Sequence, residues 1–128
     1  MTRNPRPIAP AVRLSWIAWY VVWAGFALPW AEAGMTPHWE RVQWIPFQMV
    51  RPRDVVLNLL FFVPFGALGV LSAWRVASVL LAAAAVAGFT EAVQVFAPDR
   101  WPSATDLLLN LAGTLTGLAA ARSALRRS

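Results

Sequence analysis

The sequence lacks cysteine, has a single histidine, and contains only 13% charged residues, so few side chains are available for chemistry. Without cysteine, disulfides, thiolate metal sites and a cysteine nucleophile are excluded, and no redox compartment is indicated. One imidazole does not make a metal site by itself. No nucleophile motif or phosphate-cradling glycine loop is present either. The sequence therefore predicts no metal site and no cofactor, and it leaves open whether the protein is an enzyme.

Long apolar runs dominate the chain, which is 59% hydrophobic with a mean hydropathy of +0.54. Helices formed by runs of this length cross most or all of a hydrocarbon core about 30 Å thick. We predict an all-α fold, a membrane-embedded bundle of four transmembrane helices in one domain over residues 1–128. The helices are expected at about 14–31, 55–73, 76–97 and 105–121.

Two of these helices have alternative interpretations. The fourth run is the shortest, and alone it also fits a buried helix of a soluble protein. The first run follows Arg3, Arg6 and Arg13 and precedes "AEA" at 31–33, a pattern that resembles a cleavable signal peptide. Its apolar part is longer than the core of about 7–15 residues that is usual in signals, which favours a transmembrane helix.

All 11 basic residues are arginines, and their distribution indicates an orientation. With the amino terminus inside, seven arginines fall in cytoplasmic segments and four in outer ones, as the positive-inside rule requires. We predict a multi-pass protein of the cell membrane with both termini in the cytoplasm. The loop at 32–54 then lies outside, where its prolines and tryptophans favour a segment in the headgroup layer. His38 is interpreted as a solvated residue of this loop.

A polar pattern occurs twice within the apolar runs. "DVVLNLLFF" at 54–62 and "DLLLNLAGT" at 106–114 each place an asparagine four residues after an aspartate. Asp54 therefore shares a helix face with Asn58, and Asp106 shares one with Asn110. Both helices start at the outer surface, which is consistent with two helical hairpins related by a pseudo-twofold axis.

The third predicted helix adds Glu91 and Gln94 at the same depth, on one face because they lie three residues apart. A lone charge inside a bilayer costs about 2.5–3.5 kcal/mol on insertion scales, so these groups should face the bundle interior. Arg100 is the nearest cation for Glu91. The sequence therefore predicts one outward-facing polar layer.

Each of these groups also has a structural interpretation. Aspartates at helix starts act as caps, and Ser103 with Asp106 has the spacing of a capping box. Asparagines form hydrogen bonds between helices, and Glu91 can pair with Arg100 without any ligand. The glycines are interpreted as sites of close helix approach: Gly66, Gly69, Gly88, Gly113 and Gly117.

Residues 44–117 resemble the VanZ-like family of small bacterial membrane proteins. The resemblance rests on "IPF" at 45–47, "DVVLNLLFFVPFG" at 54–66 and "EAVQVFAPDRWPSATDLLLNLAGTLTG" at 91–117. The family pattern falls on Asp54, Asn58, Phe62, Pro64, Gly66, Glu91, Gln94, Arg100, Ser103, Asp106, Asn110 and Gly113. The named member of the family is associated with teicoplanin resistance, and the resemblance does not supply a mechanism.

The favoured function is binding or modification of an envelope lipid or lipid-linked headgroup, with Arg53, Arg100 and the outer loop holding an anionic group. Partners would be membrane lipids, a lipid-linked cell-wall precursor or a lipoglycopeptide, with no nucleic acid, and a homo-oligomer is compatible with the sequence. A membrane enzyme acting on a phosphate-bearing lipid and a proton-coupled transporter stay open as alternatives. The candidate binding residues are Asp54, Asn58, Glu91, Gln94, Arg100, Ser103, Asp106 and Asn110.

Overall fold

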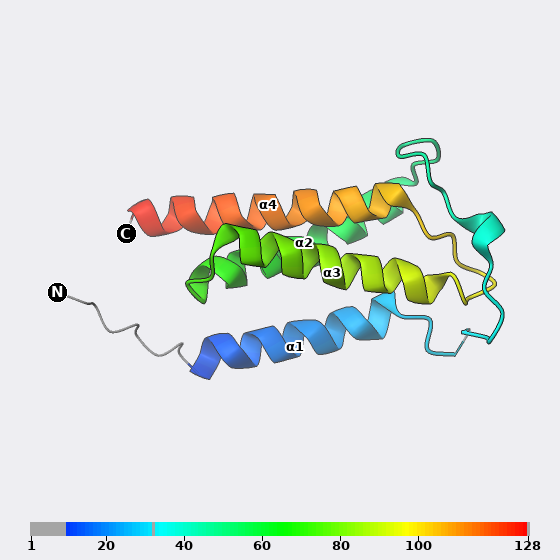
Figure 1. The fold of residues 1–128 in the computed structure, drawn as a ribbon. Coiled ribbons are helices and arrows are strands. Elements are labelled where there is room, and N and C mark those ends of the chain that lie inside the picture. Colours follow the sequence, from blue (N-terminus) through cyan, green and yellow to red (C-terminus); the bar gives the residue numbers. More distant parts are fainter. Residues whose placement is uncertain (1–9, 32, 128) are drawn as a thin grey trace.

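The computed structural model describes residues 10–31 and 33–127, and within them the chain forms a bundle of four α-helices (Figure 1). The helices are α1 (Pro10–Ala27), α2 (Pro52–Leu71), α3 (Val76–Gln94) and α4 (Ala104–Arg127), and a short 3₁₀ turn, η1 (Trp39–Arg41), lies between α1 and α2. The described residues contain no strand, only an isolated bridge between Gln43 and Ser103. The prediction of an all-helical fold is confirmed.

Prolines decide several helix boundaries that hydropathy misplaced. The first helix ends at Ala27 rather than 31, because the residue before Pro29 disfavours the helical conformation. Pro52 opens α2, where its missing N–H costs nothing. The fourth helix continues to Arg127, beyond the predicted end at 121. Its last residues are polar but form helices readily, so hydropathy ended the run before the helix ends.

Three helices, α2, α3 and α4, are long and apolar enough to cross a membrane. The described part of α1 does not reach the same apolar level, since Arg13 and several amphipathic tryptophans lie within its 18 residues. That α1 also crosses the membrane stays a prediction.

The closest packing in the bundle joins α2 to α4, which run in the same direction (Figure 1). A Cβ added to Gly66 would meet the carbonyl oxygen of Thr114, and one added to Gly117 would meet that of Val63. Gly113 likewise faces the backbone of Leu59, and Gly69 faces the side chain of Val79 on α3. These glycines are therefore packing positions, as predicted. Gly88 is not, because a Cβ there would meet nothing within 4 Å.

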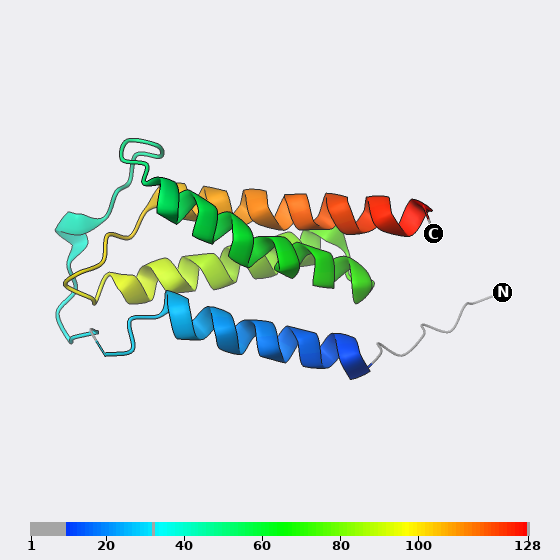
Figure 2. The same cartoon turned by 180° about the vertical axis from the view of Figure 1, so that it is seen from behind.

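The two ends of the bundle differ. The start of α1, the α2–α3 turn and the end of α4 lie at one end, which we call the turn end (Figures 1 and 2). The other, the loop end, carries the long loop (33–51) and the short connection from α3 to α4 (95–103). Because α2 and α4 both begin there, the two aspartate–asparagine pairs lie at the same end of the bundle. The pseudo-twofold relation between the hairpins stays a prediction.

Candidate functional site

The long loop lies across the short connection and is tied to it by backbone hydrogen bonds. Gly34 and His38 donate N–H groups to the carbonyls of Phe96 and Val95, both at 2.8 Å. Gln43 donates its N–H to the carbonyl of Pro102 at 2.9 Å and accepts the N–H of Ala104 at 3.1 Å. These bonds satisfy backbone groups that would otherwise be unpaired, so the loop forms an ordered cover over the loop end.

Two further contacts fix this cover. The N–H of Phe47, a residue with a positive φ of 61°, donates to Oγ1 of Thr105 at 2.8 Å. The guanidinium of Arg41 lies 5.7 Å from the ring centroid of Trp101 on the short connection, within the range of a cation–π contact. Loop and connection are therefore joined by side chains as well as by backbone.

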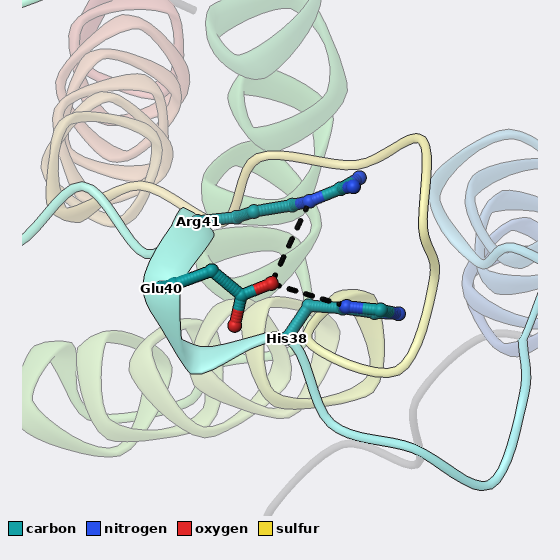
Figure 3. Close-up of polar contacts among 3 residues, drawn as sticks. All are labelled: His38, Glu40 and Arg41. Atoms are coloured by element: carbon teal, nitrogen blue, oxygen red, sulfur yellow. Dashed lines mark hydrogen bonds and ion pairs between the residues drawn. The ribbon is translucent and has the colours of Figure 1, made fainter.

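The histidine of the long loop belongs to a small ionic group on the surface (Figure 3). Oε1 of Glu40 lies 3.2 Å from Nδ1 of His38 and 3.9 Å from Nε of Arg41. The pKa of Glu40 is lowered, first by a hydrogen bond from its own backbone and then by His38 and Arg41. Such exposed pairs add little stability. The group lies on the surface around η1, outside the bundle interior.

Beneath the cover lies a cavity of about 550 Å³ at the loop end. Its wall includes all eight residues predicted from the sequence, contributed by α2, α3, the short connection and α4. The polar lining also contains Arg53, which the sequence analysis expected to hold an anionic group, and five residues that it did not name: Gln43, Arg51, Thr90, Asp99 and Thr105. Their nearness is a property of the fold, whereas a role in binding stays a prediction. The sequence signal for Arg51 was its place in "RPRD" at 51–54, near Arg53 and the first aspartate.

Ser103 connects α3 to the start of α4. Its Oγ accepts the N–H of Thr105 at 3.1 Å, so it caps the helix as its spacing suggested. The second half of the expected capping box differs, because the N–H of Ser103 donates to Oε2 of Glu91 at 2.6 Å instead of to Asp106. Glu91, 12 residues earlier in the chain, thus takes the acceptor role predicted for Asp106. No ion pair joins Glu91 to Arg100 within the described residues, although both line the cavity.

The carboxylate of Asp106 is left facing α2. Asp54, Asn58 and Arg51 lie close enough to interact with it electrostatically. An interhelical hydrogen bond by Asn58, one of its two interpretations, stays a prediction. Polar side chains near the starts of the two parallel helices thus lie close together.

Asn110 differs from its counterpart on α2. Its side chain is only 4% exposed, and among the described residues no donor is placed to bond its Oδ1. A buried acceptor without a donor costs about 1–3 kcal/mol, so most folds avoid one. Asn110 also lines the cavity. Its residue belongs to the cavity wall, and the oxygen itself is covered.

Gln94 has a different role from the rest of the predicted layer. Its Nε2 donates to the carbonyl of Ala27 at 3.2 Å, which joins the end of α3 to the end of α1. This bond satisfies one of the carbonyls that the last turn of a helix leaves free. As for metals, the described chain holds no group of three or more carboxylate or histidine side chains placed to bind one.

Comparison with known proteins gave one finding. Residues 12–125 match the family model described as VanZ/LLP1, which covers nearly the whole chain and extends the resemblance seen at 44–117. No curated protein and no solved structure matched the chain.

Proposed function

The chain belongs to the VanZ/LLP1 family, and we propose that its loop-end cavity binds the phosphate-bearing headgroup of an envelope lipid at the outer face of the membrane. The observation that carries this proposal is the convergence of arginines, carboxylates and amides in one cavity of about 550 Å³. A cavity of this size lies within the range of about 300–1,000 Å³ that is usual for ligand sites. It lies at one end of a bundle in which three helices are long enough to cross a membrane.

Arginines supply the attraction for phosphate. Arg51 and Arg53 reach the cavity from the start of α2, and Arg100 reaches it from the short connection. A guanidinium presents several donors in a planar fork that matches phosphate oxygens, and such charge-assisted bonds are stronger than neutral ones.

The acceptors in the same wall narrow the chemistry of the ligand. A phosphate alone would be repelled by Asp54, Glu91, Asp99 and Asp106, which all line the cavity. A headgroup that also carries hydroxyl or ammonium donors would satisfy these carboxylate oxygens. Lipid-linked sugars, the form in which cell-wall precursors are carried, combine a phosphate with several hydroxyls. They are the ligand class that we propose.

Orientation is the first testable part. Since the chain has no cysteine, single cysteines introduced at Met35 in the long loop and Ser123 in α4 can be labelled without background. Met35 is 97% exposed and Ser123 is exposed, whereas Ser103 is buried and unsuitable for labelling. We expect a membrane-impermeant maleimide to label Met35→Cys in intact cells and Ser123→Cys only after permeabilisation. The opposite pattern would place the cavity at the cytoplasmic face.

Binding is tested by removing guanidiniums at each end of the bundle. We expect Arg51→Gln combined with Arg53→Gln to weaken binding of a polyprenyl-phosphate-linked sugar by about tenfold or more, because a hydrogen bond to a charged group contributes about 1.5–3 kcal/mol. The matched control, Arg126→Gln with Arg127→Gln, removes the same charge at the turn end and should bind normally. Native mass spectrometry of the full chain measures the bound lipid. Equal loss in both pairs would attribute the effect to net charge.

Reduced susceptibility to teicoplanin is a separate expectation that follows from the same proposal. Expression in a teicoplanin-sensitive bacterium should reduce its susceptibility, and the Arg51 and Arg53 pair of changes should abolish that effect. Unchanged susceptibility with normal lipid binding would reject the link to resistance alone. Chemical conversion of the bound lipid would favour the enzyme alternative instead.

A further inference from the structure

The cavity wall has a second, apolar part that the polar site does not use. On the side of α1 it contains Trp23, Gly25 and Phe26, and on the side of α2 it contains Leu57 and Phe61. The cavity therefore continues from the loop end down between these two helices. In a membrane this part would adjoin the acyl chains of the bilayer.

The exposed surfaces of its apolar side chains indicate that this part of the cavity is open to the side of the bundle. Phe26 and Leu57 line the cavity, yet 70% and 38% of their surfaces are exposed. Next to them Val22 and Leu60 are exposed as well, at 45% and 61%. A water-filled mouth walled by such side chains would be unfavourable, whereas hydrocarbon suits them.

The contacts between α1 and α2 near the cavity are mainly aromatic. Towards the turn end α1 is anchored by Trp16, whose Nε1 donates to Oγ of Ser72 at 2.8 Å and whose ring packs on Phe65. Beside the cavity Nε1 of Trp19 donates to the carbonyl of Phe61 at 2.8 Å, and the ring of Phe61 packs on Phe26 with centroids 5.9 Å apart. The Phe26 ring is exposed and lies outside that hydrogen bond, so a chain of methylene groups can displace it by rotamer change.

The loop end is partly covered by an ordered loop. The long loop contributes Gln43, Met49 and Val50 to the cavity wall, and Gln43 is bonded to the short connection through both its N–H and its carbonyl. A large headgroup arriving from water would have to pass this loop. A headgroup arriving from within the membrane would not.

We propose that the site takes its ligand laterally from the bilayer, with the phosphate held at the loop end and the hydrocarbon chain passing between α1 and α2 beside Gly25, Phe26 and Phe61. This inference rests on the proposed function, and it narrows the ligand to a phosphate that carries a long chain. Free phosphate esters from solution are then poor ligands, because they lack the apolar contacts of this passage.

Gly25 allows a test that adds bulk without disturbing the fold. A Cβ at Gly25 would meet nothing within 4 Å, and the position lines the passage, so Gly25→Leu fills space that the chain would occupy. Gly88 is the matched control, since it too lies in an exposed helix position with nothing within 4 Å but does not line the cavity. Both changes replace glycine with a better helix former, so neither should prevent folding.

Two probes that differ in chain length distinguish the passage from the polar site. Both probes carry the same phosphate-linked sugar: the polyprenyl form has the long chain, and the dimethylallyl form is its water-soluble counterpart with one isoprene unit. We expect wild type and Gly88→Leu to bind the polyprenyl form about tenfold or more tightly than the dimethylallyl form. Gly25→Leu should lose that advantage by about tenfold while its weak affinity for the dimethylallyl form is unchanged.

Other outcomes separate the two proposals. Normal binding of the polyprenyl form by Gly25→Leu, or equal loss of both probes, would overturn the lateral passage and leave the phosphate site in place. Equal affinity of wild type for the two probes would overturn it as well. Binding of neither probe by wild type would reject the phosphate site and, with it, the passage.

Discussion

Gly117→Ala is expected to destabilise the bundle strongly, although it adds only one methyl group. The new Cβ would collide with the carbonyl oxygen of Val63, and that oxygen belongs to helix backbone that cannot turn aside. Overpacking usually costs about 1–3 kcal/mol, and a clash with backbone on both sides of a helix interface belongs at the upper end of that range. Thermal unfolding in detergent and protein abundance in membranes measure the effect.

Gly88→Ala is the control for this change. It makes the same chemical substitution inside a helix, but its Cβ meets nothing within 4 Å, and alanine forms helices better than glycine by about 1 kcal/mol. We expect its melting temperature to equal or exceed that of wild type. If Gly117→Ala had the same melting temperature as Gly88→Ala, that result would contradict the close contact of α2 and α4.

The result would also bear on the site. Gly66, Gly113 and Gly117 set the spacing of α2 and α4, and this spacing places Asn58 near Asp106 across the interface. Separation of the helices by even the width of a methyl group would move the polar side chains of the two helices apart. Gly117→Ala protein that still inserts should therefore bind the lipid poorly.

Glu91 is the residue whose replacement should affect function most. In Glu91→Ala the buried N–H of Ser103 loses its acceptor, a cost of about 1–3 kcal/mol, so melting temperature and abundance should fall together with lipid binding. Glu91→Gln keeps an oxygen in the same place and can still accept that N–H. We expect Glu91→Gln to insert and melt nearly as wild type does, yet to lose lipid binding and any protection against teicoplanin.

The comparison of the two variants separates the interpretations that the sequence left open. If Glu91 only orients the short connection, Glu91→Gln should retain binding. If it contacts the ligand together with Arg100, then Arg100→Gln should resemble Glu91→Gln, and the double variant should be little worse than either. Full recovery of abundance and binding in the double variant would contradict a shared site and favour a structural pair.

Patterns among residues close in sequence were sufficient to predict part of this structure. Four helical segments follow from apolar runs bounded by proline, and the four-residue spacing of Asp54 with Asn58 and of Asp106 with Asn110 places each pair on one helix face. Both properties depend on neighbours in sequence. The ends of α1 and α4 were predicted at the wrong residues, because hydropathy reports burial in lipid and a helix can begin or end outside the lipid.

The contacts that define the cavity depend on residues far apart in the chain. The sequence by itself determined the helices, their polar faces and the family to which the chain belongs. Only the tertiary structure decided that Glu91 receives the N–H of Ser103, that Gln43 pairs with Pro102 and Ala104, and that Gly25 lines the cavity. Gly88 and Gly117 look alike in sequence and differ because one faces open space and the other faces a backbone carbonyl. Helix periodicity specifies which residues share a face, whereas the packing of one helix on another specifies what that face meets.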